Sequence, residues 1–374
     1  MASPIFVSNP RAGYSLKAFL RGIQLAILGT YRLSQSPRWK TAKYLAHFPQ
    51  TLLYSIVVQL CLCCPIFGLK VLAYAVSYRT ESKYLEVFVY GLQYVVFDVL
   101  HLPIVIVSAA LYFSWFPDES FMATIKHYDE LNSSASEMAL LLYSTTLALL
   151  EQQEPKIGGF PPTFASIQHK YKNSQIFLEF AQRISATLIL NLLLFTAHKV
   201  PIVGSIAMGL IAFQSFNEII GTDRAVVLFL CIQAFPHDTT LSIMTYYWGC
   251  KDLMHDLLMP FFSRVKLSNR ERQQWMKSRG GPLLGFAMFF FLLINRLPWM
   301  SFVIYDIASG AMAYFLTKLS DPPPTQTNRL IDWNVSQMLW SKEKEQSFLL
   351  GQFALVDEGY ASFPGSSLFI VHHH

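Results

Sequence analysis

The stretch "NRLPWMSFVIYDIASGAMAYF", Asn295–Phe315, is strongly apolar, yet it contains a cation, a proline and a carboxylate. Arg296 lies two positions before Pro298, and Asp306 lies in the middle of "FVIYDIAS". If such a segment lies in a membrane, each charged side chain needs an ionic partner or a wet cavity. The solvent around this segment therefore decides how the whole sequence is interpreted.

The composition favours a membrane as that solvent. Hydrophobic residues make up 53% of the 374 residues, and charged residues only 14%, whereas a soluble protein has about 25% charged residues. A large soluble helical core is the alternative, but it requires polar faces at helical spacing, and the apolar blocks lack them. Each block exceeds the roughly 20 residues that cross the hydrocarbon core. The blocks are Thr51–Tyr78, Val87–Phe116, Ala186–Phe216, Ala225–Trp248 and Leu283–Leu316.

Several of these blocks contain an internal proline, which removes a helical hydrogen bond and kinks or breaks the helix. The apolar stretch 186–235 and the block Leu283–Leu316 are also too long for one straight span at 1.5 Å per residue. Broken backbone at membrane depth is tolerated only where protein or water surrounds it. We therefore predict an all-α, polytopic membrane protein of four to six spans, with proline-broken long helices or half-spanning hairpins. The prolines concerned are Pro65, Pro103, Pro201 and Pro298.

Two basic segments predict the topology. Arg11–Lys43 contains seven Lys or Arg and no acid, and Arg264–Arg279 contains six with one Glu. The positive-inside rule places both in the cytosol, in agreement with an even number of spans between them. Within the first segment, Ala18–Leu33 predicts an amphipathic helix on the membrane surface. The net charge of +5 predicts contact with anionic lipid and not with nucleic acid, because no recognition motif accompanies it.

These features divide the chain into three parts: a cytosolic basic segment 1–46, a helical transmembrane domain 47–320 and a weakly structured cytosolic tail 321–374. The tail begins at Asp321-Pro-Pro-Pro324, where the composition becomes polar. We expect the protein in the endoplasmic reticulum with both termini in the cytosol. The cluster Cys61-Leu-Cys-Cys64 has no partner at zinc spacing, so we interpret it as packing.

Parts of the chain resemble known membrane families. The segments "KVPIVGSIAMGLIAF" and "GPLLGFAMFFFLLINRLPWMSFVIYDIASGAMAYFL", with the basic region between them, are similar to the family of CysZ and the etoposide-induced proteins. Ala287 stands where that family has the second glycine of "GFG". The N-terminal "LRGIQLAILGTYRLSQSPRW" resembles fungal UsgS-type membrane proteins. The resemblance implies a helical membrane fold, and some members of the wider family carry anions across membranes.

Acidic residues near the apolar blocks provide the candidate site. In "KDLMHDLL", Asp252 and Asp256 are four positions apart, so both carboxylates face the same way on a helix. Paired carboxylates suit Mg²⁺, which prefers oxygen ligands and leaves room for substrate phosphates. The segment "NEIIGTD" supplies further oxygen ligands from Asn217, Glu218 and Asp223. A charge at membrane depth is costly unless it faces a partner or a wet cavity. The candidate substrate-binding residues on this ground are Asp98, Lys199, Arg296 and Asp306.

"DLMHD" resembles the DxxxD element of UbiA-type prenyl-transfer enzymes and, more closely, fungal membrane-bound sesquiterpene cyclases of the bergamotene-synthase type. This resemblance implies a Mg²⁺-dependent terpene cyclase of secondary metabolism, with a prenyl diphosphate, preferably farnesyl diphosphate, as substrate. Asp252, Asp256, Glu218 and Asp223 would hold the metal, and Asn217 would assist them. The acids depart from the UbiA pattern, because only 29 positions separate Asp223 from Asp252.

Simpler interpretations remain for each motif. Asp252 and Asp256 also fit a solvated helix end paired with Lys251, and Gly221-Thr222 fits a turn between two spans. Arg296 and Asp306 also fit buried structural ions inside the protein. The alternative function is therefore a CysZ-like membrane carrier or organisational protein without catalytic activity. A cyclase needs the acids at the mouth of one cavity, whereas a carrier would distribute them or pair them with cations.

Overall fold

The computed structural model describes residues 16–36, 42–80, 84–102, 104–107, 116–133, 143–152, 175–198, 209–214, 225–227, 229–230, 237–265 and 267–323, together with Ile206 and Trp333. About 93% of the structure is helical, and no strand occurs within these ranges. The prediction of an all-α chain is confirmed.

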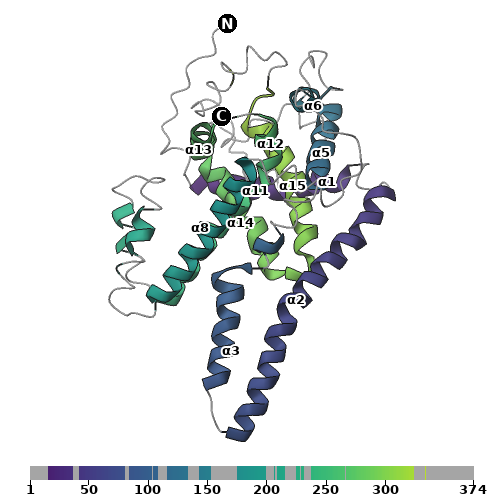
Figure 1. The fold of residues 1–374 in the computed structure, drawn as a ribbon. Helices are drawn as coiled ribbons and strands as arrows, with labels where there is room; N and C mark the ends of the chain where they lie inside the picture. Colours follow the sequence, from purple (N-terminus) through teal and green to yellow (C-terminus); the bar gives the residue numbers. More distant parts are fainter. Residues whose placement is uncertain are drawn as a thin grey trace, which may run out of the picture.

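A helical hairpin forms the centre of the fold (Figure 1). Its arms are α14 (Gly280–Arg296) and α15 (Ser301–Leu319), and the short 3₁₀ turn η3 (Pro298–Met300) joins them. The chain leaves helical geometry at Leu297, immediately before Pro298, as expected for a residue that precedes proline. The predicted break at Pro298 is therefore confirmed. Aromatic side chains from both arms fill the core, among them Phe286 and Phe315, whose ring centroids lie 4.7 Å apart.

Helix α1 (Leu16–Gln35) crosses both arms of this hairpin and packs closely against them. The contact depends on two glycines, because a Cβ on Gly22 would overlap the carbonyl oxygen of Pro282, and one on Gly285 would overlap that of Phe19. The buried face of α1 consists mainly of small residues, an arrangement that allows two helix backbones to approach closely. The basic N-terminal segment thus contributes a helix to the core of the bundle.

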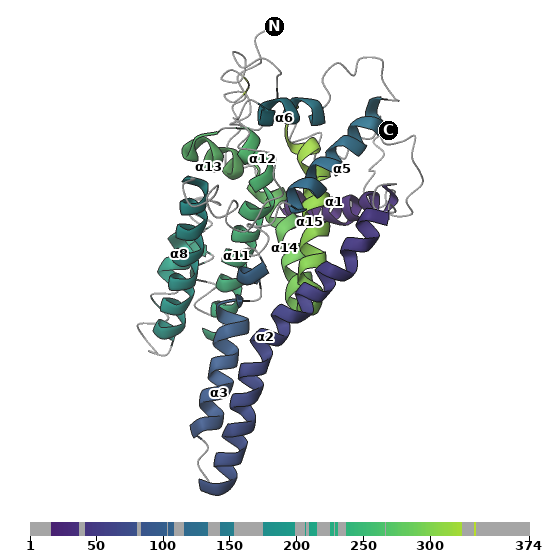
Figure 2. The same cartoon turned by 45° about the vertical axis from the view of Figure 1, so that its right-hand side comes forward.

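Helix α2 (Ala42–Thr80) and helix α3 (Tyr84–Tyr94) form a second hairpin that extends away from the bundle (Figure 2). Only 11% of the most apolar 18-residue window within Phe48–Leu72 is buried, against 83% of the corresponding window within Pro298–Leu319. An apolar helix so exposed needs lipid or another protein around it. Pro49 and Pro65 both lie inside α2, which remains a continuous helix. The predicted break at Pro65 is therefore wrong.

The break predicted near Pro103 is present. Helix α3 passes into a π-helical turn, η2 (Val95–Val99), and regular geometry ends at His101, whose φ is 47°. This left-handed backbone is uncommon for a residue other than glycine. The His101 ring packs edge-on against Tyr246 and Phe291, with centroids 5.1 and 5.2 Å away. The chain therefore turns sharply inside an aromatic environment.

The remaining helices surround the central hairpin. Helix α5 packs on α15, and α8 packs on α11. Helix α13 meets α14 at an angle of 85°. Their bounds are α5 (Phe116–Ser133), α6 (Tyr143–Gln152), α8 (Gln175–His198), α11 (His237–Leu257), α12 (Met259–Arg264) and α13 (Asn269–Ser278).

The basic segment Arg264–Arg279 is structured and only partly solvated. It contains α13, whose N-terminus has a capping box between Ser268 and Glu271. Arg264 and Arg279, at the two ends of the segment, are both buried. Arg279 donates hydrogen bonds to the carbonyl oxygen of Leu319 at 3.0 Å and to the Ser278 hydroxyl at 2.7 Å. The segment is therefore a structured part of the bundle, and its cytosolic position stays a prediction.

Two described helices, Phe48–Leu72 and Pro298–Leu319, are long and apolar enough to cross a membrane. The bent pair α13–α14 gives a third if it counts as one span. The structure thus gives weak support to a membrane protein. The predicted four to six spans exceed this number; parts of the third and fourth apolar blocks lie outside the described residues.

Candidate functional site

The two aspartates of "KDLMHDLL" meet an arginine from a neighbouring helix. Asp252 and Asp256 lie one turn apart on α11, and Arg183 lies on α8. The Nη2 of Arg183 contacts Oδ1 of Asp256, and its Nε lies 3.6 Å from Oδ1 of Asp252. The predicted common face of the two carboxylates is therefore present. We call these three side chains the Arg183 triad.

The triad is partly buried. The exposed fractions of the side chains are 23% for Arg183, 21% for Asp252 and 7% for Asp256. Burial raises the pKa of Asp252 to about 6, and the nearby charge of Asp256 acts in the same direction, while Arg183 and Thr187 oppose the shift. The Asp252 carboxyl therefore holds its proton more readily than an ordinary aspartate does.

Other titratable groups surround the triad from three helices. Burial and the charges of Arg183, Lys251 and Arg272 lower the pKa of His255 to about 3, so His255 is neutral at physiological pH. Tyr305 of α15 interacts electrostatically with Asp256 and Arg183. Ionisable groups of α11, α13 and α15 thus surround the triad.

The geometry of Asp252 and Asp256 fits a guanidinium better than Mg²⁺. Arg183 already contacts both carboxylates, and its positive charge would repel a metal ion placed between them. Among the residues that the structure describes, no three His, Cys, Asp or Glu side chains lie close enough together to hold a metal. Glu218 and Asp223, the other predicted ligands, lie outside the described residues, as does Asn217.

The two charged residues of the segment Asn295–Phe315 differ in their surroundings. Asp306 is buried on α15, and its Oδ1 has no hydrogen-bond partner within the described part of the chain. The expectation that it faces the interior is confirmed. Arg296 is exposed at the end of α14, so the same expectation for Arg296 is wrong. The last turn of α14 places this residue on the outer surface of the hairpin.

Two other predicted residues cannot be placed in a site. Asp98 belongs to η2, which packs on α8 and α11, but its side chain lies outside the described part of the structure. Lys199 follows the end of α8 and also lies outside the described residues. The structure therefore brings Asp252 and Asp256 together. Within the described residues, none of the other candidates is shown in contact with them.

Arg183 is the member of the triad that the sequence did not predict. It stands in "LEFAQRISATLIL", three positions before the apolar block Ala186–Phe216. A lone cation at the edge of an apolar helix was the available signal, because it needs an acidic partner. Its partner Asp256 lies 73 positions away, so only the tertiary structure reveals the pair.

Comparison of the chain with protein-family models, with curated proteins and with solved structures finds no match.

Proposed function

We propose that this chain is an integral membrane protein that carries a small anion together with a proton, with the Arg183 triad as its binding site. The observation that carries the proposal is that Arg183 is shared by two carboxylates. Both apolar helices that are long enough to span a bilayer support the membrane setting. The basic flanks support a cytosolic position of the termini.

The chemistry follows from the charges of the triad. With both carboxylates ionised, one guanidinium faces two negative charges, and the excess repels an incoming anion. Protonation of Asp252 removes this excess and releases the Nε of Arg183 from its ion pair. A planar guanidinium is well suited to binding an oxyanion. Proton binding and anion binding therefore favour each other at this site, which is the requirement for their joint transport.

Uptake by proteoliposomes tests this function. The purified protein should accelerate the uptake of labelled acetate or chloride, and more strongly at pH 5.5 than at pH 7.5. Arg183→Gln should abolish the stimulated uptake, while Asp252→Asn should retain uptake but lose its pH dependence. Arg270→Gln, at an exposed position of α13, is the matched control. Absence of any protein-dependent uptake of either anion contradicts the proposal.

A Mg²⁺-dependent terpene cyclase acting on farnesyl diphosphate is the second candidate. The observation behind it is that Asp252 and Asp256 share one face of α11, although Arg183 occupies that face and would have to move for a metal ion to bind. Incubation of protein-containing membranes with farnesyl diphosphate and Mg²⁺, followed by analysis of the hydrocarbon products, distinguishes the two functions. A cyclase should lose product formation in Asp252→Asn and Asp256→Asn, and also in Glu218→Gln and Asp223→Asn. If folded protein forms no product, the cyclase function is excluded and the carrier function remains.

A further inference from the structure

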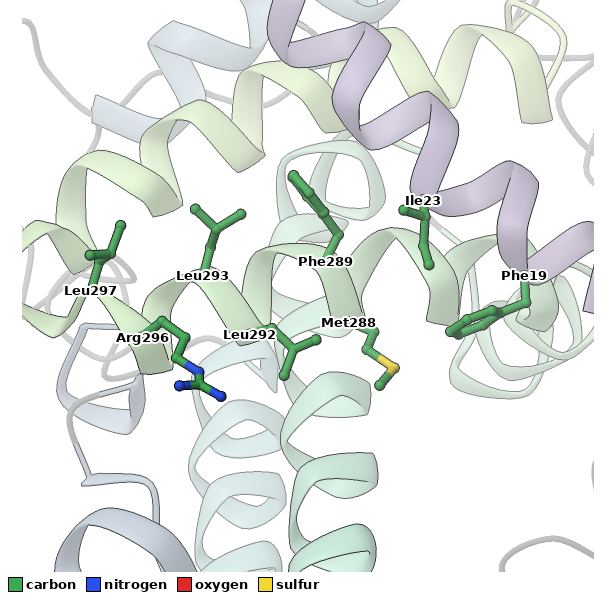
Figure 3. Close-up of a pocket in the computed structure, with 8 residues that line it drawn as sticks. All are labelled: Phe19, Ile23, Met288, Phe289, Leu292, Leu293, Arg296 and Leu297. Atoms are coloured by element: carbon green, nitrogen blue, oxygen red, sulfur yellow. The ribbon is translucent and has the colours of Figure 1, made fainter. Parts of the chain in front are cut away.

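A groove runs along the outer surface of α14 and ends against α1 (Figure 3). Its volume is about 330 Å³. Two rows of side chains, each repeating every four residues, form its walls along α14, as expected for one helix surface. Phe19 and Ile23 of α1 close the far end. The rows are Met288–Leu292–Arg296 and Phe289–Leu293–Leu297.

The lining of the groove has one charged group. Arg296 lies at the end near the hairpin turn, and all other lining residues are apolar. Its side chain is exposed, and it makes no ion pair or hydrogen bond within the described residues. A cation at the surface of an apolar helix in a bilayer is costly unless an anion compensates it. The groove is therefore complementary to a molecule with one anionic group and a long apolar body.

The length and charge of the groove define that molecule more closely. From Met288 to Leu297, the lining of the groove along α14, a helix rises roughly 14 Å at 1.5 Å per residue, which suits an extended alkyl chain whose far end reaches Phe19. One guanidinium balances one negative charge, and its fork binds a carboxylate through two hydrogen bonds. A phosphate monoester or diphosphate would leave negative charge uncompensated beside apolar side chains.

We propose that the groove between α1 and α14 binds a long-chain fatty acid from the surrounding bilayer, with its carboxylate on Arg296 and its alkyl chain along α14 toward Phe19. Three observations carry this proposal: the apolar lining, the single cation at one end, and the absence of an ionic partner for that cation in the described chain. The site is separate from the Arg183 triad and does not depend on its function.

Binding of labelled palmitate to the full-length protein in nanodiscs of zwitterionic lipid tests the proposal. Wild-type protein should bind palmitate saturably and should bind methyl palmitate much more weakly. Arg296→Gln should weaken binding about ten- to a hundred-fold, the range for loss of a charge-assisted hydrogen-bonded pair. Arg296→Lys retains the charge but loses the two-pronged guanidinium. Its palmitate affinity should therefore lie between those of the wild type and Arg296→Gln. Arg270→Gln, which is exposed on α13, should bind as the wild type does.

A second variant tests the alkyl part of the groove. Leu292→Trp adds bulk to the wall beside Arg296 and should weaken palmitate binding while the cation remains. Leu292 is exposed, at 39%, so this change should leave the fold intact, as gel filtration can verify. Equal palmitate binding by wild type and Arg296→Gln would overturn the proposal. Displacement of palmitate by an equimolar anionic phospholipid would also overturn it, because the site would then recognise a two-chain lipid.

Discussion

The hydroxyl of Ser55 accepts a hydrogen bond from the backbone N–H of Phe302, at 3.0 Å. The bond joins the long outer helix α2 to the first turn of α15. The N-terminus of α15 has no side-chain cap of its own, because its N-cap residue is Met300. Ser55 therefore supplies, from another helix, one of the acceptors that the first turn of a helix lacks.

Ser55→Ala should leave the Phe302 N–H buried without a partner and lower the free energy of unfolding by about 1–3 kcal/mol. Thermal unfolding in detergent measures the change. Ser263→Ala is a suitable control, because Ser263 is exposed and bonds only within its own helix. Equal melting temperatures for Ser55→Ala and the wild type would show that the interhelical bond contributes nothing.

The crossing of α1 and α14 predicts opposite effects of the same substitution at different glycines. Gly22→Ala and Gly285→Ala should each destabilise the protein by about 1–3 kcal/mol, because the added methyl group overlaps backbone that cannot move aside. Gly68→Ala and Gly91→Ala meet no atom within 4 Å, and should stabilise their helices by about 0.5–1 kcal/mol. Limited proteolysis near residue 36 should report loss of α1 packing only in the first pair.

Arg279 is a buried cation. Its removal should lower the free energy of unfolding more than the removal of an exposed arginine does. Besides its bonds to Leu319 and Ser278, its guanidinium lies 4.6 Å from the centroid of the Trp275 ring. Arg279→Leu should cost about 1.5–3 kcal/mol for each charge-assisted hydrogen bond that is not replaced. Chemical denaturation measures this loss. Arg270→Leu, on the exposed surface of α13, should change stability by less than about 0.5 kcal/mol.

The Arg183 triad predicts a dependence of stability on pH. The pKa of Asp252 is raised to about 6 in the folded protein, above the roughly 3.9 of an unfolded aspartate. The folded state therefore binds this proton more tightly, and the associated stabilisation is complete below about pH 4 and is lost as the pH rises through 6. The change should be on the order of 1–3 kcal/mol. Melting temperatures between pH 4 and 8 measure it.

Asp252→Asn provides the control for that titration. Asparagine cannot ionise, so the decrease in melting temperature between pH 4 and 7 should be smaller in this variant than in the wild type. If the two pH profiles coincide, Asp252 is not the group responsible.

The helical class and the break at Pro298 could be predicted from the sequence because both depend on local chemistry: long apolar runs and the missing N–H of proline. The prediction failed at Pro65, since an apolar helix exposed along its length can retain proline without a visible break. The outcome at a proline depends on the packing around it, and single-sequence patterns do not contain that packing.

The site was predicted only in part. The i,i+4 spacing placed Asp252 and Asp256 on one face, as the shared contact with Arg183 confirms. The nature of their partner depended on how α8 and α11 pack. Small residues in α1, including Gly22 and Ala26, were interpreted only as part of an amphipathic helix. Their role in close helix contact depends on a partner in α14 that is more than 250 positions away.

The contact between Ser55 and Phe302 also fixes a vertical offset between the two apolar spans. Ser55 lies only seven positions into Phe48–Leu72, yet it meets the beginning of Pro298–Leu319. With Phe48–Leu72 across a bilayer, most of the described helices would lie toward one side, and the α2–α3 hairpin would extend alone farthest toward the other. In a bilayer, a cross-section that is broad in one leaflet and narrow in the other would displace unequal amounts of lipid and give the described part of the protein the shape of a wedge.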